Sequence, residues 1–295
     1  MLIRSESGLV RGSGVAELVA LMQTVLMVVF LWSMNLGQGM SFTVGEVLAP
    51  FKRAGVIALA VVLNSVLIPL LYWGLTRILP MGHDFAIGFM LVGFAAAAPF
   101  AIKAAVIARG DVPLGIGLVV LLGALNVVAM PLWSAILMPA GTTVNALNIA
   151  GTLVVLVLLP LAAGLYIRAR WSTRAQKWAP LASKLSSIAL VLLVVLMLAT
   201  SWQSIVSVFG SWVITGSLIA LAVSMLAGYF IAMGAPSRRA SSLVSGMRAV
   251  GPALAIASSA FGENTTVIAT VIVLGILSFL PFGVAIAWGK RLRSE

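Results

Sequence analysis

Two basic residues, Lys103 and Arg248, stand inside long apolar runs rather than in polar connections. A charge in hydrocarbon is costly unless it faces a cavity or a partner, so such residues are first read as functional. A guanidinium makes paired hydrogen bonds to a carboxylate or sulfonate, whereas an ammonium acts as a point charge. The two side chains therefore predict a cationic pocket for an organic anion.

Simpler roles for these residues stay open at this point. Lys103 lies six residues before Arg109, about 9 Å along a helix, so its ammonium can instead reach the membrane surface. Arg248 lies nine residues after Arg239, about 14 Å, which places it near mid-membrane. Asn64, another polar residue in an apolar run, is either a ligand or a bridge between two helices.

The composition predicts an integral membrane protein. Of 295 residues, 62% are hydrophobic and 8% charged, and the mean hydropathy is +1.17; one soluble core could not bury so much apolar surface. The formal charge of +11 comes from short basic clusters between apolar runs, the pattern of cytoplasmic loops, so nucleic-acid binding is not expected.

The polar residues exclude most catalytic chemistry. The chain has no cysteine, hence no disulfide, thiolate metal site or cysteine nucleophile. Its single histidine, His83, falls in a predicted loop, and no carboxylate pair lies in an apolar run. We therefore expect no catalytic residues, no metal site and no cofactor, and do not expect an enzyme.

Nine apolar segments have the length of about twenty residues that crosses a hydrocarbon core of about 30 Å. Because backbone polar groups must be paired inside lipid, we expect all of them to be helices. The expected fold is thus an all-α integral membrane protein forming one polytopic domain over residues 1–295. The predicted spans are 17–36, 54–76, 85–108, 113–138, 146–167, 185–205, 212–234, 240–261 and 265–288.

The basic residues orient these spans. With nine spans, thirteen Lys and Arg fall on one side and three, Arg4, Arg11 and Arg77, on the other. The positive side is normally cytoplasmic. This predicts a multi-pass protein of the cell inner (plasma) membrane with its N-terminus outside and its C-terminus in the cytoplasm.

Two parts of the chain repeat a pattern. Residues 85–138 and 240–288 each hold an apolar run with one cation, a turn and a long helix that reaches a proline, Pro131 or Pro281. The first turn lies on the inner side and the second on the outer side, which indicates inverted repeats with a site at mid-membrane. We place the first repeat at 15–138, without its first helix, and the second at 146–289, on either side of the basic connection 168–184.

Both cation-bearing runs contain residues that interrupt helices. Pro99 lies in the first, and Gly246, Gly251 and Pro252 lie in the second. Broken helices expose backbone groups that line a cavity, although ordinary proline kinks and small-residue packing faces give the same pattern. With Lys103, Arg248 and Asn64, the candidate substrate-binding residues are Pro99, Gly246 and Met247.

Several segments carry a family resemblance over nearly the whole chain. These are "FLWSMNLGQGM" followed by an amphipathic stretch and "FKR", then "NSVLIPLL", a proline-containing span ending "ARGD", and "RRASSLVSGMRAVGPALAIASSAFG". In order and spacing they resemble the bile acid:sodium symporter family. The resemblance implies two inverted five-helix repeats with crossed, broken helices four and nine, here without the first helix, and a monomer.

The departures from the family concern its sodium ligands. Where the family has a Ser-Asn pair, this chain has Ala101 and Ile102; where it has Glu, Gln and Asn, this chain has Val244, Arg248 and Ala249. Asn64 alone stays polar at a ligand position. Sodium needs several oxygen donors, normally with carboxylate charge, and every Asp and Glu falls at the end of a span or in a loop.

The expected function is therefore secondary transport of a small organic anion by alternating access. The expected partners are that substrate and the lipid bilayer. In this hypothesis Lys103 and Arg248 replace the charge of the sodium ions. Facilitated movement, anion exchange and proton symport through Lys103 stay open as coupling modes. The alternatives are a sodium-coupled symporter of the usual family type and a membrane sensor that does not transport.

Overall fold

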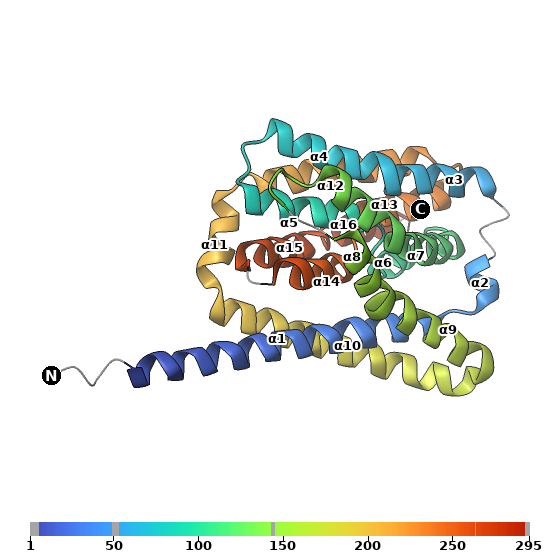
Figure 1. Ribbon diagram of the computed structural model, residues 1–295. Helices are drawn as coiled ribbons and strands as arrows, with labels where there is room; N and C mark the ends of the chain where they lie inside the picture. Colours follow the sequence, from blue (N-terminus) through green and yellow to red (C-terminus); the bar gives the residue numbers. More distant parts are fainter. Residues whose placement is uncertain (1–5, 49–52, 143–144, 263, 293–295) are drawn as a thin grey trace.

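The computed structural model describes residues 6–48, 53–142, 145–262 and 264–292, and every regular element in them is helical (Figure 1). The all-α expectation is thus confirmed. The elements are α1 (Glu6–Ser41), α2 (Val44–Leu48), α3 (Ala54–Val62), η2 (Leu63–Leu67), α4 (Ile68–Ile78), α5 (His83–Phe94), α6 (Phe100–Ile107), α7 (Val112–Leu137), α8 (Ala146–Leu153), η3 (Val154–Leu158), α9 (Leu159–Arg170), α10 (Ser172–Thr200), α11 (Trp202–Gly210), α12 (Val213–Phe230), α13 (Ala235–Gly246), α14 (Val250–Phe261), α15 (Thr265–Leu277) and α16 (Pro281–Arg291).

Eight helical segments of the described chain are long and apolar enough to cross a membrane. They correspond to all the predicted spans except 85–108, which is divided between α5 and the shorter α6. The count of nine therefore stays a prediction. The eight segments are Glu17–Ser41, Ala54–Ile78, Val112–Leu137, Ala146–Arg170, Ser172–Thr200, Val213–Phe230, Ala235–Phe261 and Thr265–Arg291.

The basic connection at 168–184 differs from the expected polar loop. Helix α9 continues to Arg170 and α10 already begins at Ser172, with Trp171 between them. Lys, Arg, Ala and Gln favour helix almost as well as leucine does, so the helices extend beyond their apolar runs. The basic residues of this segment are thus held on helices, with Arg168 on α9 and Lys184 on α10.

The helices form two bundles. Helix α1 packs along α10 and α9, and these three form the lower layer in Figure 1. The second bundle contains α3 to α7 and α12 to α16, in which α13 packs on α12, α6 and α7, and α15 packs on α5. The interrupted helices α5–α6 and α13–α14 lie within this second bundle, so the first bundle covers one side of them.

The first bundle depends on two glycines at the contact of α1 with α9. A Cβ atom added to Gly39 would lie 2.2 Å from the Leu161 carbonyl oxygen, and one added to Gly164 would lie 2.4 Å from the Leu36 carbonyl oxygen. Such small residues let membrane helices approach backbone to backbone. No flexible side chain separates these helices at that point, so a larger residue must push them apart.

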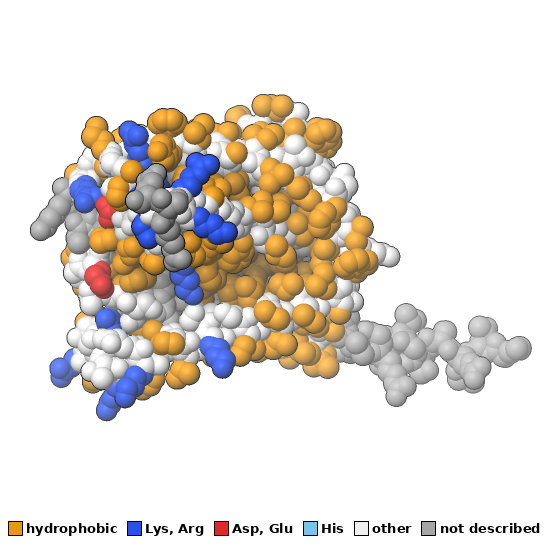
Figure 2. Space-filling model, turned by 180° about the vertical axis from the view of Figure 1, so that it is seen from behind, with side chains coloured by type: hydrophobic (Ala, Val, Ile, Leu, Met, Phe, Trp, Pro, Cys, Tyr) orange, Lys and Arg blue, Asp and Glu red, His pale blue; other side chains and the backbone are white. Residues whose placement is uncertain are grey.

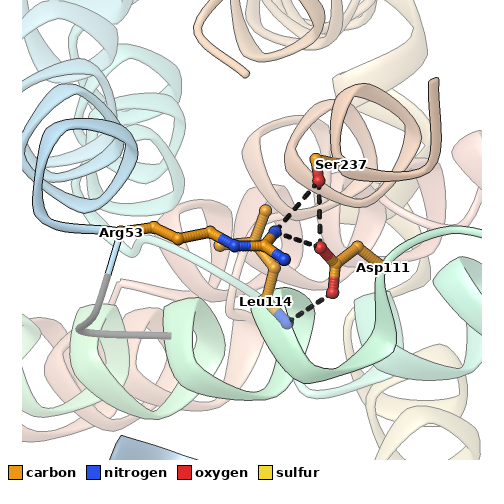
Figure 3. Close-up of polar contacts among 4 residues, drawn as sticks. All are labelled: Arg53, Asp111, Leu114 and Ser237. Carbon is orange, nitrogen blue, oxygen red and sulfur yellow. Dashed lines mark hydrogen bonds and ion pairs between the residues drawn. The ribbon is translucent and has the colours of Figure 1, made fainter. Parts of the chain in front are cut away.

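The polar groups at the basic end join three helices of the second bundle. Lys and Arg side chains gather at one end of the face seen in Figure 2, and hydrophobic side chains cover most of the rest. At that end Asp111 pairs with Arg53, and the Ser237 hydroxyl donates to Asp111 at 2.9 Å (Figure 3). The Leu114 amide also donates to Asp111, at 3.1 Å, so this carboxylate caps α7.

The Asp111 carboxylate is held in its ionised form. Burial, the largest single influence, raises its pKa, but the Leu114 amide, Arg53 and Ser237 together outweigh burial and leave the pKa below its usual value. Because the folded pKa is lower than the unfolded pKa, the stabilisation is complete above the unfolded value and is lost as the pH falls through the folded value.

We expect Gly164→Ala to lower the stability of the protein, because its new methyl group meets the α1 backbone. Overpacking of this kind costs about 1–3 kcal/mol. Gly151→Ala is the matched control, since nothing lies within 4 Å of a Cβ atom there. Thermal unfolding in detergent measures both, and equal midpoints for the two variants would contradict the close approach.

We expect Asp111→Asn and Asp111→Ala to differ at pH 7, because asparagine keeps the helix cap and alanine loses it, at a cost of about 1 kcal/mol. Relative to wild type, the asparagine variant loses the negative charge and the second acceptor oxygen, Oδ2, which receives hydrogen bonds from Arg53 and Ser237. Its deficit should be present at pH 7 and shrink as the pH falls below about 4, where the carboxylate of the unfolded wild-type chain begins to be protonated. Unfolding midpoints in detergent at pH 7 and pH 3 test this, and a deficit of equal size at both pH values would refute it.

Candidate functional site

The two interrupted helices cross at their breaks. Helix α5 ends at Phe94 and α6 begins at Phe100, while α13 ends at Gly246 and α14 begins at Val250. The two unwound segments pair through their backbones: the Ala98 amide donates to the Met247 carbonyl and the Ala249 amide to the Ala95 carbonyl, both at 3.0 Å. The predicted interruptions are thus present, and each satisfies part of the other's backbone.

A side chain of α7 completes the first break. The Asn126 amide donates to the Ala96 carbonyl and accepts from the Ala96 amide, both at 3.0 Å. The next residue, Ala97, has a φ of 55°, a left-handed conformation that costs about 1–2 kcal/mol for a residue with a side chain. Asn126 is itself buried, so the unwound backbone is fastened from the interior of the bundle.

Arg248 lies at the second break with only 2% of its surface exposed. Its Nη2 donates to Asn64 Oδ1 at 2.7 Å and to the Ser245 carbonyl at 2.9 Å, and Nη1 donates to the Gly93 carbonyl at 3.3 Å. All three acceptors are neutral. Within the described residues, Nε of Arg248 has no hydrogen-bond partner and no carboxylate pairs with the guanidinium.

Both carbonyls that hold Arg248 come from helix ends. Gly93 lies in the last turn of α5, and Ser245 lies in the last turn of α13. The last four carbonyls of a helix have no partner inside it and carry its partial negative charge. The guanidinium therefore stands where two helix C-termini converge, the position at which half-helices of transporters coordinate cations.

A cavity lies beside this cation, between the two bundles. It has a volume of about 70 Å³, room for about two water molecules at about 30 Å³ each. Arg248 contributes to its wall, and so do Pro99 and Phe100 at the start of α6 and Val250 and Gly251 at the start of α14. The rest of the wall is mostly apolar and comes from Phe30, Met34, Ala98, Leu190, Val194, Met247, Leu254, Ile272, Gly275, Ile276, Ser278 and Phe279.

The electrostatics of this cavity favour an anion. The first amides of α6 and α14 have no partner inside their helices and carry partial positive charge. The guanidinium adds a full positive charge on the same wall. Two helix N-termini and a buried arginine thus place positive charge around an otherwise mostly apolar wall.

The structure gives Lys103 a different environment from that of Arg248. Lys103 is exposed and lines an open cleft of about 720 Å³ at the basic end, together with Arg168 and Lys184. Its ammonium lies 6.0 Å from the centroid of the Phe100 ring. Phe100 also borders the 70 Å³ cavity, so α6 contributes a residue to the wall of each space. The structure nevertheless does not bring both cations into one cavity.

Of the other candidate residues, some pack around the crossing and some line the cavity. Asn64 lies in η2, the π-helical turn just before Pro69, and also donates to Ser245 Oγ at 3.0 Å. Asn64 therefore bonds to both Arg248 and α13 and does not line the cavity. Pro99 and Met247 line the cavity, whereas Gly246 packs against Met225, where a Cβ atom would lie 2.3 Å from the Met225 side chain. Substrate binding by these residues stays a prediction.

Three residues of this site were not among the sequence candidates. Asn126 could have been found, because it is the one strongly polar residue in the apolar run of α7. Ser245 stands among several small residues, and Gly93 contributes only a carbonyl oxygen. A backbone acceptor leaves no signal in the residue type, so neither contact was predictable.

No group of three or more His, Cys, Asp or Glu residues occurs in the described chain. The oxygen atoms nearest the crossing belong to carbonyls and amides, and three of them are bound to Arg248. A hard cation that needs several oxygen ligands would compete with the guanidinium for these acceptors.

Comparison with known proteins agrees with this architecture. The family model described as the Sodium Bile acid symporter family matches residues 27–208, well over half of the chain. The match covers α5, α6 and α7 and ends within α11. No curated protein matches the chain.

We expect Asn64→Leu to destabilise the protein, because it leaves one guanidinium donor of Arg248 and the Ser245 hydroxyl without their partner. A buried donor without a partner costs about 1–3 kcal/mol. The control is Asn148→Leu, which introduces the same change at an exposed position of α8. Thermal unfolding in detergent should separate the two variants, and equal stability would show that the Asn64 contact contributes nothing.

Proposed function

Since the chain belongs to the sodium bile acid symporter family, a family of membrane transporters, we propose that it carries an organic anion across the membrane without sodium. The observation that carries the proposal is the buried Arg248 beside two helix N-termini, all on one cavity wall. The substrate class follows from that wall, which combines one guanidinium with mostly apolar side chains. It suits an anion with an apolar body.

The proposed independence from sodium rests on what Arg248 occupies. Its guanidinium uses the carbonyls at the ends of α5 and α13 and the amide oxygen of Asn64. These are neutral oxygens of the kind that coordinate sodium in discontinuous helices of transporters. A covalently attached cation cannot be carried across, so the charge that attracts the anion stays with the protein.

Alternating access would move the two bundles relative to each other. The cavity is bounded by α1 and α10 on one side and by the crossing on the other, and the cleft that contains Lys103 lies between α1, α9 and α10 on one side and α6 on the other. At about 70 Å³ the cavity is closed to a bile acid, so the bundles must separate to admit one. Inverted repeats at 15–138 and 146–289 provide the symmetry for such a motion.

The proposed orientation follows the positive charges. Lys103, Arg168 and Lys184 share the cleft at the end to which Arg53 also belongs. Excess positive charge marks the cytoplasmic side of the inner (plasma) membrane. In this orientation the cleft opens toward the cytoplasm, and the outer end of the molecule bears α11 and the α4–α5 connection.

We expect anions such as taurocholate to raise the unfolding temperature of the purified protein equally in sodium and in potassium buffers. A screen of sulfonates and carboxylates by thermal shift, followed by uptake of the radiolabelled hits into proteoliposomes, measures this. Arg248→Met should reduce uptake at least tenfold because it removes the central charge. Arg248→Lys should raise KM with a smaller loss, since lysine keeps the charge but not the paired hydrogen bonds.

The matched control for charge is Lys177→Met. Lys177 lies on α10 at the basic end and does not line the cavity or the cleft, so uptake should be unchanged. Uptake that requires sodium would refute sodium independence. Specific binding without any flux would favour the sensor alternative over a transporter.

A further inference from the structure

The charge moved by a transporter in one complete cycle is the charge of what it carries, because the protein's own charges return to their starting positions. Every Asp and Glu whose side chain is described lies at the end of an apolar membrane-length segment or in the connections between such segments: Glu17, Glu46, Asp84 and Asp111. At the crossing, a guanidinium, which stays protonated at neutral pH, occupies the acceptors that a coupling cation would use.

We propose that this protein is an electrogenic exporter: the anion crosses as the only charge, and the inside-negative membrane potential drives it out of the cell. The proposal rests on the sodium-independent anion transport proposed above. Each elementary charge gains enough energy from 100 mV to support a concentration ratio of about 50-fold. For a monovalent anion that ratio favours the outside, the reverse of accumulation driven by sodium.

The two openings between the bundles differ in charge: the one at the basic end is cationic and the other is neutral, which favours export of an anion. The cleft at the basic end has three cations, Lys103 on α6 and Arg168 and Lys184 on the opposite bundle. Nε of Arg168 is buried without a partner, and none of the three cations forms an ion pair within the described residues. The carboxylate near Arg168, that of Glu46, accepts hydrogen bonds from Thr43.

The opening at the other end is uncharged. Its volume is about 270 Å³, and its polar wall comes from the neutral residues Gln23, Thr24 and Ser258. A cleft lined by one sign of charge concentrates counter-ions and raises their association rate by about 10-fold or more. Anions are therefore captured from the basic side, and no described residue that lines the opening at the other end carries a charge.

The test uses the full-length protein in proteoliposomes with radiolabelled taurocholate and benzenesulfonate, two sulfonates that stay ionised and do not leak as neutral acids. Valinomycin and opposite potassium gradients set the potential. With the inside positive by about 100 mV, we expect accumulation that approaches about 50-fold; with the inside negative, we expect the vesicles to lose preloaded label. Because these end points are thermodynamic, they do not depend on which way the protein is inserted.

A pair of substitutions separates loading from driving force. Lys103→Met combined with Lys184→Met should slow flux at low substrate and low salt several-fold, while the accumulation at the end point stays that of wild type. Lys177→Met, which removes a charge of the same end outside the cleft, should leave both unchanged. Equal flux at low substrate and low salt in wild type, the double variant and Lys177→Met would contradict the loading role of the cleft.

Flux that only equalises the label at every potential would overturn electrogenic export, and it would identify exchange or neutral movement instead. Accumulation driven by a sodium gradient or a pH gradient at zero potential would also overturn it. These outcomes leave anion transport itself intact. In contrast, no flux of either sulfonate under any gradient would remove the proposed transport function and this inference together.

Discussion

The organisation of this protein depends on one cation held by the ends of two interrupted helices. Arg248 reaches the carbonyls of Gly93 and Ser245, which α5 and α13 leave unpaired because both helices stop at the crossing. Neither the interrupted helix ends nor a buried arginine would be stable here without the other, because the free carbonyls need donors and the guanidinium needs acceptors. Asn64 supplies the third acceptor, so α3–α4 is fastened to the same point.

The same interruptions place partial negative charge at the guanidinium and partial positive charge at the cavity. Helix C-termini face the guanidinium, while the N-termini of α6 and α14 border the cavity with it. Partial positive charge and the full charge of Arg248 therefore act on the same space. The wall that completes this space belongs to the bundle of α1, α9 and α10, whose close contact at Gly39 and Gly164 makes it one unit. In the transport cycle that we propose, motion between these two units changes access to the cavity without breaking the crossing.

The sequence was informative about the membrane helices and their breaks, and less so about how side chains are turned. Pro99 and Gly246 indicated the interruptions correctly, because such residues disfavour a continuous helix. Segment 168–184 was expected to be a loop, since hydropathy reports the end of an apolar run and not the end of a helix. The pairing of Lys103 with Arg248 was expected from their places in two corresponding apolar runs and from the comparison with the family's sodium ligands, but the structure places the two in separate spaces.

By itself the sequence determined the fold class, the family and the presence of a cation within an apolar helical segment, because long apolar runs, helix breakers and a lone arginine are properties of local sequence. Only the tertiary structure decided what surrounds that cation. Its partners come from Gly93, Asn64 and Ser245, up to 184 residues away along the chain, and two of the three contacts use backbone carbonyls. Which helix face turns inward, and which carbonyl is left free there, depends on packing between distant segments and is not written in any residue type.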